Sequence, residues 1–357
     1  MHIGRLGIAN TRRISFAELS LDDGMSLIVG PNGSGKTSLL EGAAIACSGK
    51  SFHTNAAADL IHRGAQGLGI RAMMIRDQGE HFHVAISKTL KSTDISIDQR
   101  DVNASSEIAK HCPLVVLHAQ SYQLVSSVPA VRRNLLDRTM FHVEHSYLAW
   151  WRGFHQALRA RNALLRENRP YSEAIYWDEQ LLDYAAQINT ARFRFIDFLS
   201  QYLKTAPLSE TYGKIAVKFR QGWREDDNLA TRLKDSWRED CARGHTRVGP
   251  HRADITFESD EHGGKTKLSR GQAKVAAVAV KCAQAAFIIE NTDERPVFLV
   301  DDLASELDSG NISKTLQLIA TLGCQTVLTA IRSDSLSVAN NGIRQMFHVE
   351  HGDVVSH

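Results

Sequence analysis

Residues 30–37 have the types and spacing of a loop that holds phosphate groups. The segment fits the pattern G-x-x-x-x-G-K-[ST] and continues into Ser38, reading Gly30-Pro31-Asn32-Gly33-Ser34-Gly35-Lys36-Thr37-Ser38. Glycines let backbone N–H groups point at phosphate oxygens, and the start of a helix adds favourable dipole charge. In this pattern Lys36 reaches the β- and γ-phosphates and the Thr37 hydroxyl contacts Mg²⁺. The segment therefore predicts an ATP site formed by residues 30–38.

A pair of carboxylates, Asp301 and Asp302, follows the apolar run 297–300. A carboxylate at the end of a strand beside a phosphate loop is where Mg²⁺ takes its second protein contact, usually through water. We expect Thr37 and Asp301 to hold the metal. The adjacent Asp302 is placed to orient an attacking water, so Asp302 and Lys36 are the predicted catalytic residues.

The elements around these residues predict an α/β fold. The apolar run 25–29 resembles a buried strand, and the segment 38–49 after the loop resembles a helix. Alternating stretches at 2–8 and 14–21 favour further strands. A helix over 311–323, a buried strand over 325–331 and a final strand over 345–351 would complete a mixed sheet.

Two long amphipathic segments, 147–165 and 177–203, interrupt this α/β pattern. They are joined near residues 168–172, which predicts an antiparallel helical arm. Three parts follow from this pattern: a first part of an ATPase head at 1–118, a mainly helical insertion at 119–246, and a second part of the head at 247–357.

The segment LSRGQ occupies residues 268–272, more than two hundred residues after the phosphate loop. Its residues Ser269, Arg270, Gly271 and Gln272 resemble the Leu-Ser-Gly-Gly-Gln signature of ABC-type ATPases. In that class the signature completes the ATP site of a second subunit, which implies a two-fold dimer joined by ATP. Arg270 replaces the usual glycine, and it either faces the γ-phosphate across the interface or points to solvent.

The segment SELD at residues 305–308, with Ser305 and Asp308, matches the loop that crosses such a dimer interface. Nearly the whole chain also resembles the RecF family, which is related to the Rad50 and SMC heads. The resemblance is carried, in order, by GSGKTSLLEG, GKSFHT, VPAVRRNLLDR, ARNALL, WDEQL, VGPHRAD, LSRGQ and VDDLASELD. It implies an ABC-type P-loop ATPase head with mixed β-sheets and an inserted helical arm.

Membership of this family would imply an ATP- and Mg²⁺-dependent homodimer that binds double-stranded DNA and single-strand/double-strand junctions. Such a dimer acts with RecR and RecO to load recombinase during DNA repair. Asp302 takes the place of the longer catalytic glutamate of transporters, and no histidine follows the segment 325–329. We therefore expect slow, DNA-stimulated ATP hydrolysis that times the opening of the dimer.

Some residues depart from the family pattern. Residues 10–12 lack the usual aromatic side chain, residues 120–121 replace a Pro-Glu pair, and Ala253 takes the place of an aspartate. The second of these changes puts a local metal-sensing contact in doubt.

Arginines concentrate on and just before the first arm helix, and the resemblance favours DNA phosphates as their partners. The candidates are Arg132, Arg133, Arg152, Arg159 and Arg161. Such contacts carry no sequence information and are sensitive to salt. From the charge pattern alone, a solvated helix face is equally consistent.

Composition limits the class of protein. The chain has 357 residues, 43% of them hydrophobic, and a formal charge of +2, so any DNA contact must come from a local patch. Five scattered cysteines argue against a disulfide framework or zinc site. No secretory signal is recognisable, and Lys281 and Gln284 interrupt the apolar segment 275–289. We expect a cytoplasmic protein that uses this segment as a buried helix and has no membrane partner.

The hexapeptide MFHVEH occurs at residues 140–145 and again at 346–351. Its His and Glu residues suggest a metal site, but neither copy has an evident third ligand. One codon choice for the hexapeptide is a palindrome that resembles a bacterial chromosome partition site, so the repeat could instead be selected as DNA. For the whole chain, a short SMC-like DNA-bridging ATPase and the ATPase subunit of a transporter are the alternative functions.

Overall fold

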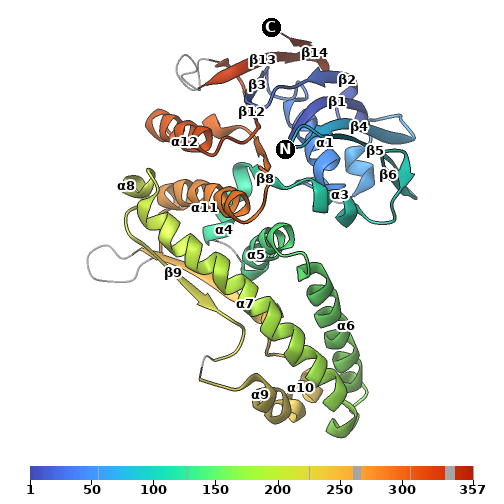
Figure 1. Ribbon diagram of the computed structural model, residues 1–357, viewed down its shortest axis with the longest axis vertical. Helices are drawn as coiled ribbons and strands as arrows, with labels where there is room; N and C mark the ends of the chain where they lie inside the picture. The colour runs from blue at the N-terminus through green and yellow to red at the C-terminus, as the bar shows by residue number, and fades with distance from the viewer. Residues whose placement is uncertain are drawn as a thin grey trace. The chain divides into compact units, whose positions relative to one another are not determined.

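The computed structural model describes residues 1–357 apart from 55, 127, 225, 260–266, 306, 334–341 and 357. The chain forms two compact units (Figure 1). The head unit comprises Met1–Tyr122, Ala206–Tyr212 and Arg270–His357, and the arm unit comprises Gln123–Thr205 and Gly213–Ser269. The head unit is therefore assembled from segments that are far apart in the sequence.

One sheet of the head unit is mainly parallel and carries the phosphate loop. Its strand order is β14-β13-β3-β12-β11-β8, and only β13 and β14 pair in antiparallel fashion. These strands are Asp353–Ser356, Ile343–Glu350, Met25–Val29, Thr326–Ala330, Val297–Val300 and Leu114–Leu117. Every residue of β3, β11 and β12 is buried, as continuous apolar runs in a parallel sheet require.

The second sheet of the head unit is antiparallel, with the strand order β2-β1-β4-β5-β6-β7. Its strands are Ile14–Ser20, His2–Thr11, Gly67–Ile75, His81–Thr89, Thr93–Ile97 and Arg100–Asp101. Buried and more exposed residues alternate along β4 and β5, so one face of this sheet is directed to the core. The two sheets together confirm the predicted mixed α/β architecture.

Helix α1, Lys36–Ser48, packs against strands of both sheets (Figure 1). Almost all of its residues are buried, and the core around it includes Ile8, Leu40 and Leu299. Shorter elements complete this side of the head unit, namely α2 at Ala57–Leu60, α3 at Ser105–His111 and the 3-10 turn η1 at Ala119–Tyr122. Because α1 is fixed on several sides, the loop that precedes it has a rigid support.

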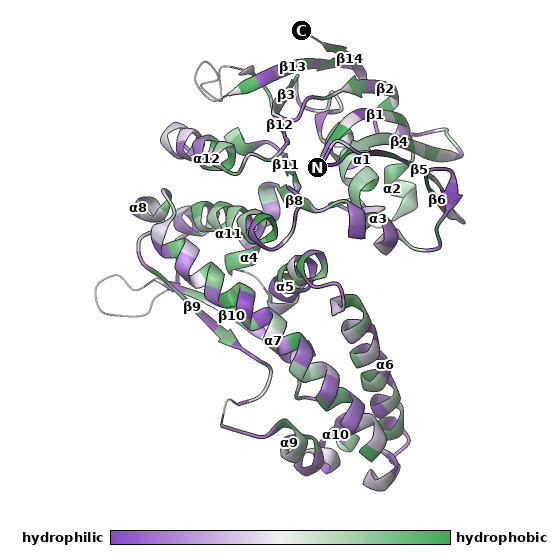
Figure 2. Ribbon diagram, in the orientation of Figure 1, coloured by the Kyte–Doolittle hydropathy of each residue, from purple (hydrophilic) through white to green (hydrophobic). Residues whose placement is uncertain are grey.

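Helix α11, Arg270–Asn291, contains the apolar segment predicted to be a buried helix. By length and composition it could cross a membrane, but 72% of its most apolar window is buried inside the protein. Most of α11 is hydrophobic in Figure 2, whereas α7 alternates in character. The short helix α8, Ser209–Tyr212, and η1 pack against α11, so its burial has a structural cause. Helix α12, Ser309–Thr321, also contacts α11 and follows the turn η5, Leu303–Ser305.

The arm unit is mainly helical. Its two longest helices, α6 at Tyr147–Arg166 and α7 at Ile175–Thr205, pack along each other as the sequence predicts. Their buried faces include Phe154 and Leu165 on α6 and Phe195 on α7. The remaining elements are α4 Gln123–Ser126, α5 Pro129–Val143, η2 Tyr171–Glu173, β9 Ile215–Arg220, α9 Leu229–Asp235, α10 Trp237–Arg243, η3 Pro250–Arg252 and β10 Asp254–Ser259.

The expected return to the head at residue 247 needs correction, because residues 247–269 belong to the arm unit. Strand β10 pairs in antiparallel fashion with β9 along its whole length. In addition, Arg132 on α5 donates hydrogen bonds of 2.7 and 3.1 Å to the carboxylate of Asp254 on β10. These contacts hold the segment in the arm unit, and the head unit resumes at Arg270.

The two copies of MFHVEH have different structures. Met140 to Val143 form the end of α5, whereas Met346 to Glu350 lie in strand β13. Tertiary packing decides between helix and strand here, since the local sequence is identical. Within the part of the chain that the structure describes, no group of three His, Cys, Asp or Glu residues could hold a metal ion.

Candidate functional site

The phosphate loop lies between the end of β3 and the start of α1, where the sequence predicts it. Gly35 has φ 121°, and a Cβ atom there would lie 2.7 Å from Cδ1 of Ile14. A Cβ on Gly30 would collide with the backbone oxygen of Val349 on β13. Both positions require glycine, because the neighbouring strands leave no space for a side chain.

Lys36 folds back over this loop. Its Nζ donates to the backbone oxygens of Gly30 and Pro31, at 2.8 and 3.0 Å. Burial lowers the pKa of Lys36, and the nearby Asp302 and Asp301 oppose that shift. The ammonium group thus lies above the turn whose N–H groups would hold phosphate, which is where its predicted role requires it.

Asp301 and Thr37 meet, although they are far apart in the sequence. The Thr37 hydroxyl lies 3.1 Å from both carboxylate oxygens of Asp301, and the Thr329 hydroxyl donates to Oδ1 at 2.8 Å. Burial would raise the pKa of Asp301, but hydrogen bonds from His53, Thr329 and Thr37 outweigh it and lower the pKa. A hydroxyl and an ionised carboxylate are the oxygen ligands that Mg²⁺ prefers, so these residues fit that metal.

Asp302 is held by the same threonine. Its backbone N–H donates to the Thr329 hydroxyl at 2.9 Å, and its backbone is in the left-handed region with φ 49°. One buried hydroxyl on β12 therefore sets the positions of both acidic residues. The Asp302 side chain lines the same cavity as Lys36 and Thr37.

That cavity has a volume of about 250 Å³ and is lined by residues of the loop, by both acidic residues and by two arginines. The lining residues are Arg12, Arg13, Asn32, Gly33, Gly35, Lys36, Thr37, Ser38, Asp301 and Asp302. Of the remaining loop residues predicted to bind ATP, Gly30 and Pro31 hold Lys36, and Ser34 is buried in the turn.

Arg12 and Arg13 were not predicted to belong to the site. Arg13 donates to the Gly33 oxygen at 2.8 Å, and Arg12 is paired with the buried carboxylate of Glu41 on α1. The sequence does contain a clue to their role, since two adjacent arginines lie in the turn between β1 and β2. Arginine side chains beside a phosphate loop favour the binding of an anion. The sequence alone did not reveal that this turn meets the loop.

Two histidines also lie beside the acidic pair. His53 Nε2 is 3.7 Å from Asp301 Oδ2, and the ring of His53 is 5.6 Å from that of His118 in an edge-on arrangement. Burial and the charge of Lys281 lower the pKa of His118 to about 4. At neutral pH His118 is therefore an uncharged member of this cluster.

The signature segment lies at the beginning of α11, which starts at Arg270. Ser269, Arg270 and Gly271 are exposed, Gln272 is half-buried, and a Cβ on Gly271 would have no neighbour within 4 Å. The Arg270 guanidinium lies 5.9 Å from the centre of the Tyr122 ring, a contact that sequence reasoning did not anticipate. Among the described residues, none of the signature lines the cavity beside the phosphate loop.

The predicted interface loop is described in part. Asp308 is the N-cap of α12 and accepts a hydrogen bond from the Asn311 N–H at 3.0 Å, which lowers its pKa. Ser305 ends η5, but its side chain and all of residue 306 lie outside the described part of the chain. Asp308 therefore caps α12 and is exposed at the surface.

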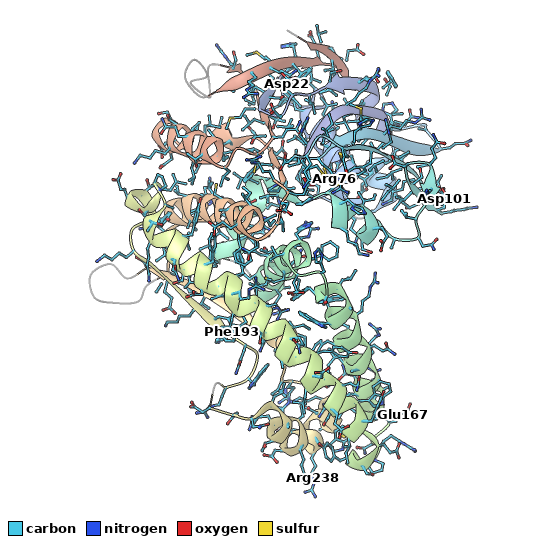
Figure 3. All side chains as sticks on the ribbon, in the orientation of Figure 1. Asp22, Arg76, Asp101, Glu167, Phe193 and Arg238 are labelled. Carbon is cyan, nitrogen blue, oxygen red and sulfur yellow. The ribbon has the colours of Figure 1, made fainter. Side chains whose placement is uncertain are left out.

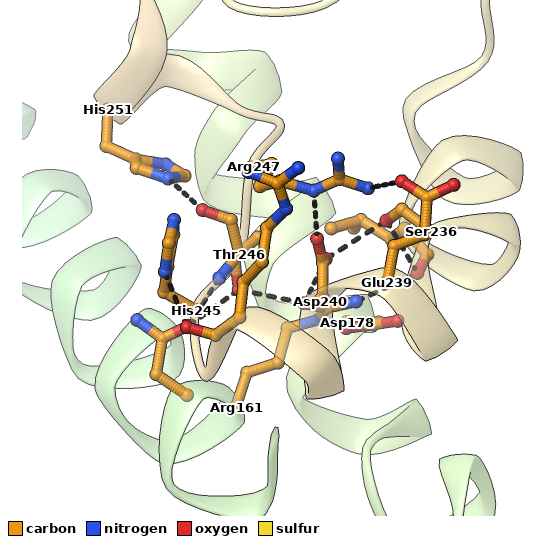
Figure 4. A network of polar contacts seen from close by, with 12 residues as sticks. Arg161, Asp178, Ser236, Glu239, Asp240, His245, Thr246, Arg247 and His251 are labelled. Atoms are coloured by element: carbon orange, nitrogen blue, oxygen red, sulfur yellow. Dashed lines mark hydrogen bonds and ion pairs between the residues drawn. The ribbon is translucent and has the colours of Figure 1, made fainter. Parts of the chain in front are cut away.

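Two of the five arginines predicted to bind DNA need correction. Arg161 is fully buried, and its guanidinium pairs with Asp178 at 2.7 Å and with Asp240 at 3.1 Å (Figure 4). It also donates to the Thr246 hydroxyl and lies over the Trp237 ring. Its partners come from α7, α10 and the loop before η3, so Arg161 holds the arm unit together instead of reaching DNA.

Arg132 is also buried, and its guanidinium donates hydrogen bonds of 2.7 and 3.1 Å to the carboxylate of Asp254. Arg133 is half-buried and donates to the Ala253 oxygen at 3.0 Å. Arg152 and Arg159 are exposed on α6 and remain candidates. Helical periodicity alone does not show which arginines are exposed, because an arginine can be buried by a carboxylate from a distant part of the chain.

Comparisons with known proteins agree with this architecture. The family described as RecF/RecN/SMC N terminal domain matches residues 2–354. The chain is 33% identical over 360 residues to the DNA replication and repair protein RecF of Shewanella oneidensis, which covers 99% of each chain. It is 34% identical over 355 residues to the protein of that name from Thioalkalivibrio sulfidiphilus, covering 99% of this chain and 98% of that one.

Solved structures show the same fold. The recombination mediator protein RecF with ATP, in the RecFOR pathway, superposes with a TM-score of 0.87 at 22% identity, covering 100% of this chain and 97% of that one. An Smc head bound to the C-winged helix domain of ScpA superposes with a TM-score of 0.64 at 14% identity, covering 100% and 98%. The chain belongs to the RecF family of DNA replication and repair proteins, within the larger RecF/RecN/SMC group.

Proposed function

We propose that this protein is an ATP-driven dimer that binds DNA and acts as a recombination mediator in repair. The observation that carries the proposal is the convergence of Lys36, Thr37 and Asp301 at the phosphate loop. The exposed signature at the start of α11 supports the dimer, because helix-start N–H groups there are accessible to a second chain's phosphates.

Each residue of the site has a distinct task in this proposal. The loop N–H groups and Lys36 would hold the β- and γ-phosphates, and Thr37 and Asp301 would hold Mg²⁺, which would supply positive charge beside those phosphates. Asp302 orients the attacking water, and its carboxylate is one carbon shorter than that of a glutamate. Hydrolysis is therefore slow, and it opens the dimer instead of driving repeated movement.

DNA is the second ligand of the proposed function. Family membership supports double-stranded DNA and single-strand/double-strand junctions as targets, with RecR and RecO as partners in the cytoplasm. The exposed Arg152 and Arg159 on α6 supply cations that could contact the DNA backbone. Phosphate contacts make binding independent of sequence and steeply dependent on salt.

The experiment that tests this function compares ATP binding and hydrolysis in the wild type, Lys36→Met and Asp302→Asn. Lys36→Met should lose tight ATP binding, whereas Asp302→Asn should bind ATP but hydrolyse it at least 100-fold more slowly, within the usual range for a general base of about 10²–10⁴. Duplex DNA should stimulate the wild type. Fast hydrolysis without DNA, or an active Asp302→Asn variant, would contradict the proposed mechanism.

A further inference from the structure

An open groove of about 910 Å³ lies entirely within the arm unit. Its walls come from the first turn of α5, the end of β9, the segment that follows β9, and the start of β10. The lining residues are Val128, Pro129, Ala130, Arg133, Arg220, Gly222, Trp223, Arg224, Asp226, Arg252 and Asp254. We call it the arginine groove, after its four arginines.

A close backbone contact fixes the shape of the groove. Gly222 has φ 106°, and a Cβ atom there would collide with the backbone oxygen of Gly249. The Gly249 N–H donates to the Gly222 oxygen at 3.2 Å, which ties the segment after β9 to the turn η3. This contact holds Trp223 and Arg224 on the same groove as Arg252.

The groove carries a net positive charge, even when the ion pairs between its own side chains are taken into account. Asp254 is buried and is already neutralised by Arg132, at 2.7 Å, and by Arg220, at 3.1 Å. Asp226 is the other acidic residue that lines the groove. Arg224 and Arg252 are exposed, and neither side chain has a hydrogen bond or ion pair with a residue in the described part of the chain.

Arg133 adds a cation that other arginines crowd. It lines the groove and is half-buried. Burial and the charge of Arg192 lower the pKa of Arg133, whereas Asp254 and Asp137 oppose that shift, and Arg252 adds to it. Crowded cations of this kind favour the binding of an anion, because a phosphate group would relieve their mutual repulsion.

We propose that the arginine groove binds an unpaired strand of DNA, with phosphates on Arg224 and Arg252 and a base on the half-exposed ring of Trp223. A cationic groove with an aromatic platform is the arrangement by which proteins bind single strands without reading sequence. A duplex would leave Trp223 without a partner, since its bases are stacked on each other. This inference rests on the proposed DNA-binding function, and it adds that the arginine groove holds single-stranded DNA.

The test measures binding of labelled oligo-dT without ATP, by anisotropy over a range of salt concentrations. The variants are Arg224→Gln with Arg252→Gln, and Trp223→Ala. The control is Arg238→Glu, an exposed arginine on α10 of the same unit that projects outward (Figure 3). Circular dichroism on each variant shows whether the fold is retained. Trp223→Phe, which keeps an aromatic platform, is measured beside Trp223→Ala as the conservative variant, and the double arginine variant carries the test if the alanine variant unfolds.

The double arginine variant should bind oligo-dT at least tenfold more weakly. Its slope of log affinity against log salt should fall by about 1.4, which corresponds to two lost phosphate contacts on a single strand. Trp223→Ala should weaken binding about tenfold or more, whereas Trp223→Phe should retain most of the affinity. The Arg238→Glu control should bind as the wild type does.

An affinity within twofold of the wild type for the double variant would overturn the proposal. Equal competition by a blunt duplex, or by an acidic peptide, would overturn it too. Dimer formation, measured on the same protein preparations after ATP is added, separates this failure from that of the proposed function. A double variant that dimerises and still binds oligo-dT normally refutes only the groove, whereas a wild type that neither dimerises nor binds DNA refutes the proposed function itself.

Discussion

Replacing Arg161 by methionine would leave the buried carboxylate of Asp178 without its cation, and it would remove one of two cations that pair with Asp240, the other being Arg247 at 2.9 Å. Both partners are almost fully buried, with exposed side-chain fractions of 6% for Asp178 and 0% for Asp240. Removing one partner of a buried ion pair costs about 3–5 kcal/mol, because the remaining charge stays desolvated. With a urea m value of about 2–3 kcal/mol per M, the unfolding midpoint should fall by about 1–2.5 M.

Urea unfolding followed by tryptophan fluorescence measures this loss, since the Arg161 guanidinium lies 5.1 Å from the centre of the Trp237 ring. Arg159→Met is the matched control on the same helix, and its exposed side chain should change stability by less than about 0.5 kcal/mol. Burial raises the pKa of Asp178, and Arg161 opposes that rise. Without Arg161, Asp178 takes up a proton more readily, so the loss should shrink at acid pH. Equal midpoints for Arg161→Met and Arg159→Met would refute the structural role of Arg161.

Three further predictions follow from other parts of the molecule. Gly35→Ala should weaken ATP binding at least tenfold in calorimetry, because its Cβ would press on Ile14; unchanged affinity would show that the loop adapts. Burial lowers the pKa of His251 to about 4, so its contribution to stability is complete above pH 6.5, the ordinary histidine value. That contribution is lost as the pH falls toward 4, by up to about 3 kcal/mol, and urea unfolding of His251→Gln should lack this loss. Arg270→Gly should change ATP-driven dimerisation less than threefold in size-exclusion chromatography, since Arg270 rests on Tyr122; a tenfold loss would mean that it reaches the second subunit.

The sequence predicted the phosphate loop and the strand that ends at the acidic pair because these signals are local. The loop spacing fixes residues 30–37 between a strand and a helix, and the apolar run before Asp301 identifies a buried strand. Parallel pairing then brings the ends of β3, β12 and β11 to one edge of the sheet, so the two signals meet. The motif spacing did not predict the role of Thr329, whose hydroxyl forms hydrogen bonds with both acidic residues.

The arm unit was harder to predict because its pairs join distant segments. Arg132 meets a carboxylate 122 residues away, and Arg161 meets one 79 residues away. Helical periodicity marks the face on which an arginine lies but not the acidic side chain that packs there. The position of residues 247–269 depends likewise on pairing between β9 and β10, which neither strand reveals alone.

The repeated hexapeptide shows the same limit most directly. Identical residues end a helix at 140–143 and form a strand at 346–350, because their neighbours differ. The second copy is constrained by the phosphate loop, since the backbone oxygen of Val349 faces Gly30. The gene sequence tests the DNA-level hypothesis, because codons that break the palindrome in both copies would exclude it.

Light scattering of the wild type and Lys36→Met, with ATP and with or without gapped DNA, tests the central claim most directly. The wild type should change from a monomer to a dimer when ATP is added, because in the proposed dimer ATP is held between the loop of one chain and the signature of the other. Lys36→Met should remain a monomer under every condition. A wild type that stays monomeric with ATP and gapped DNA, or a Lys36→Met variant that dimerises equally well, would contradict the proposed mechanism.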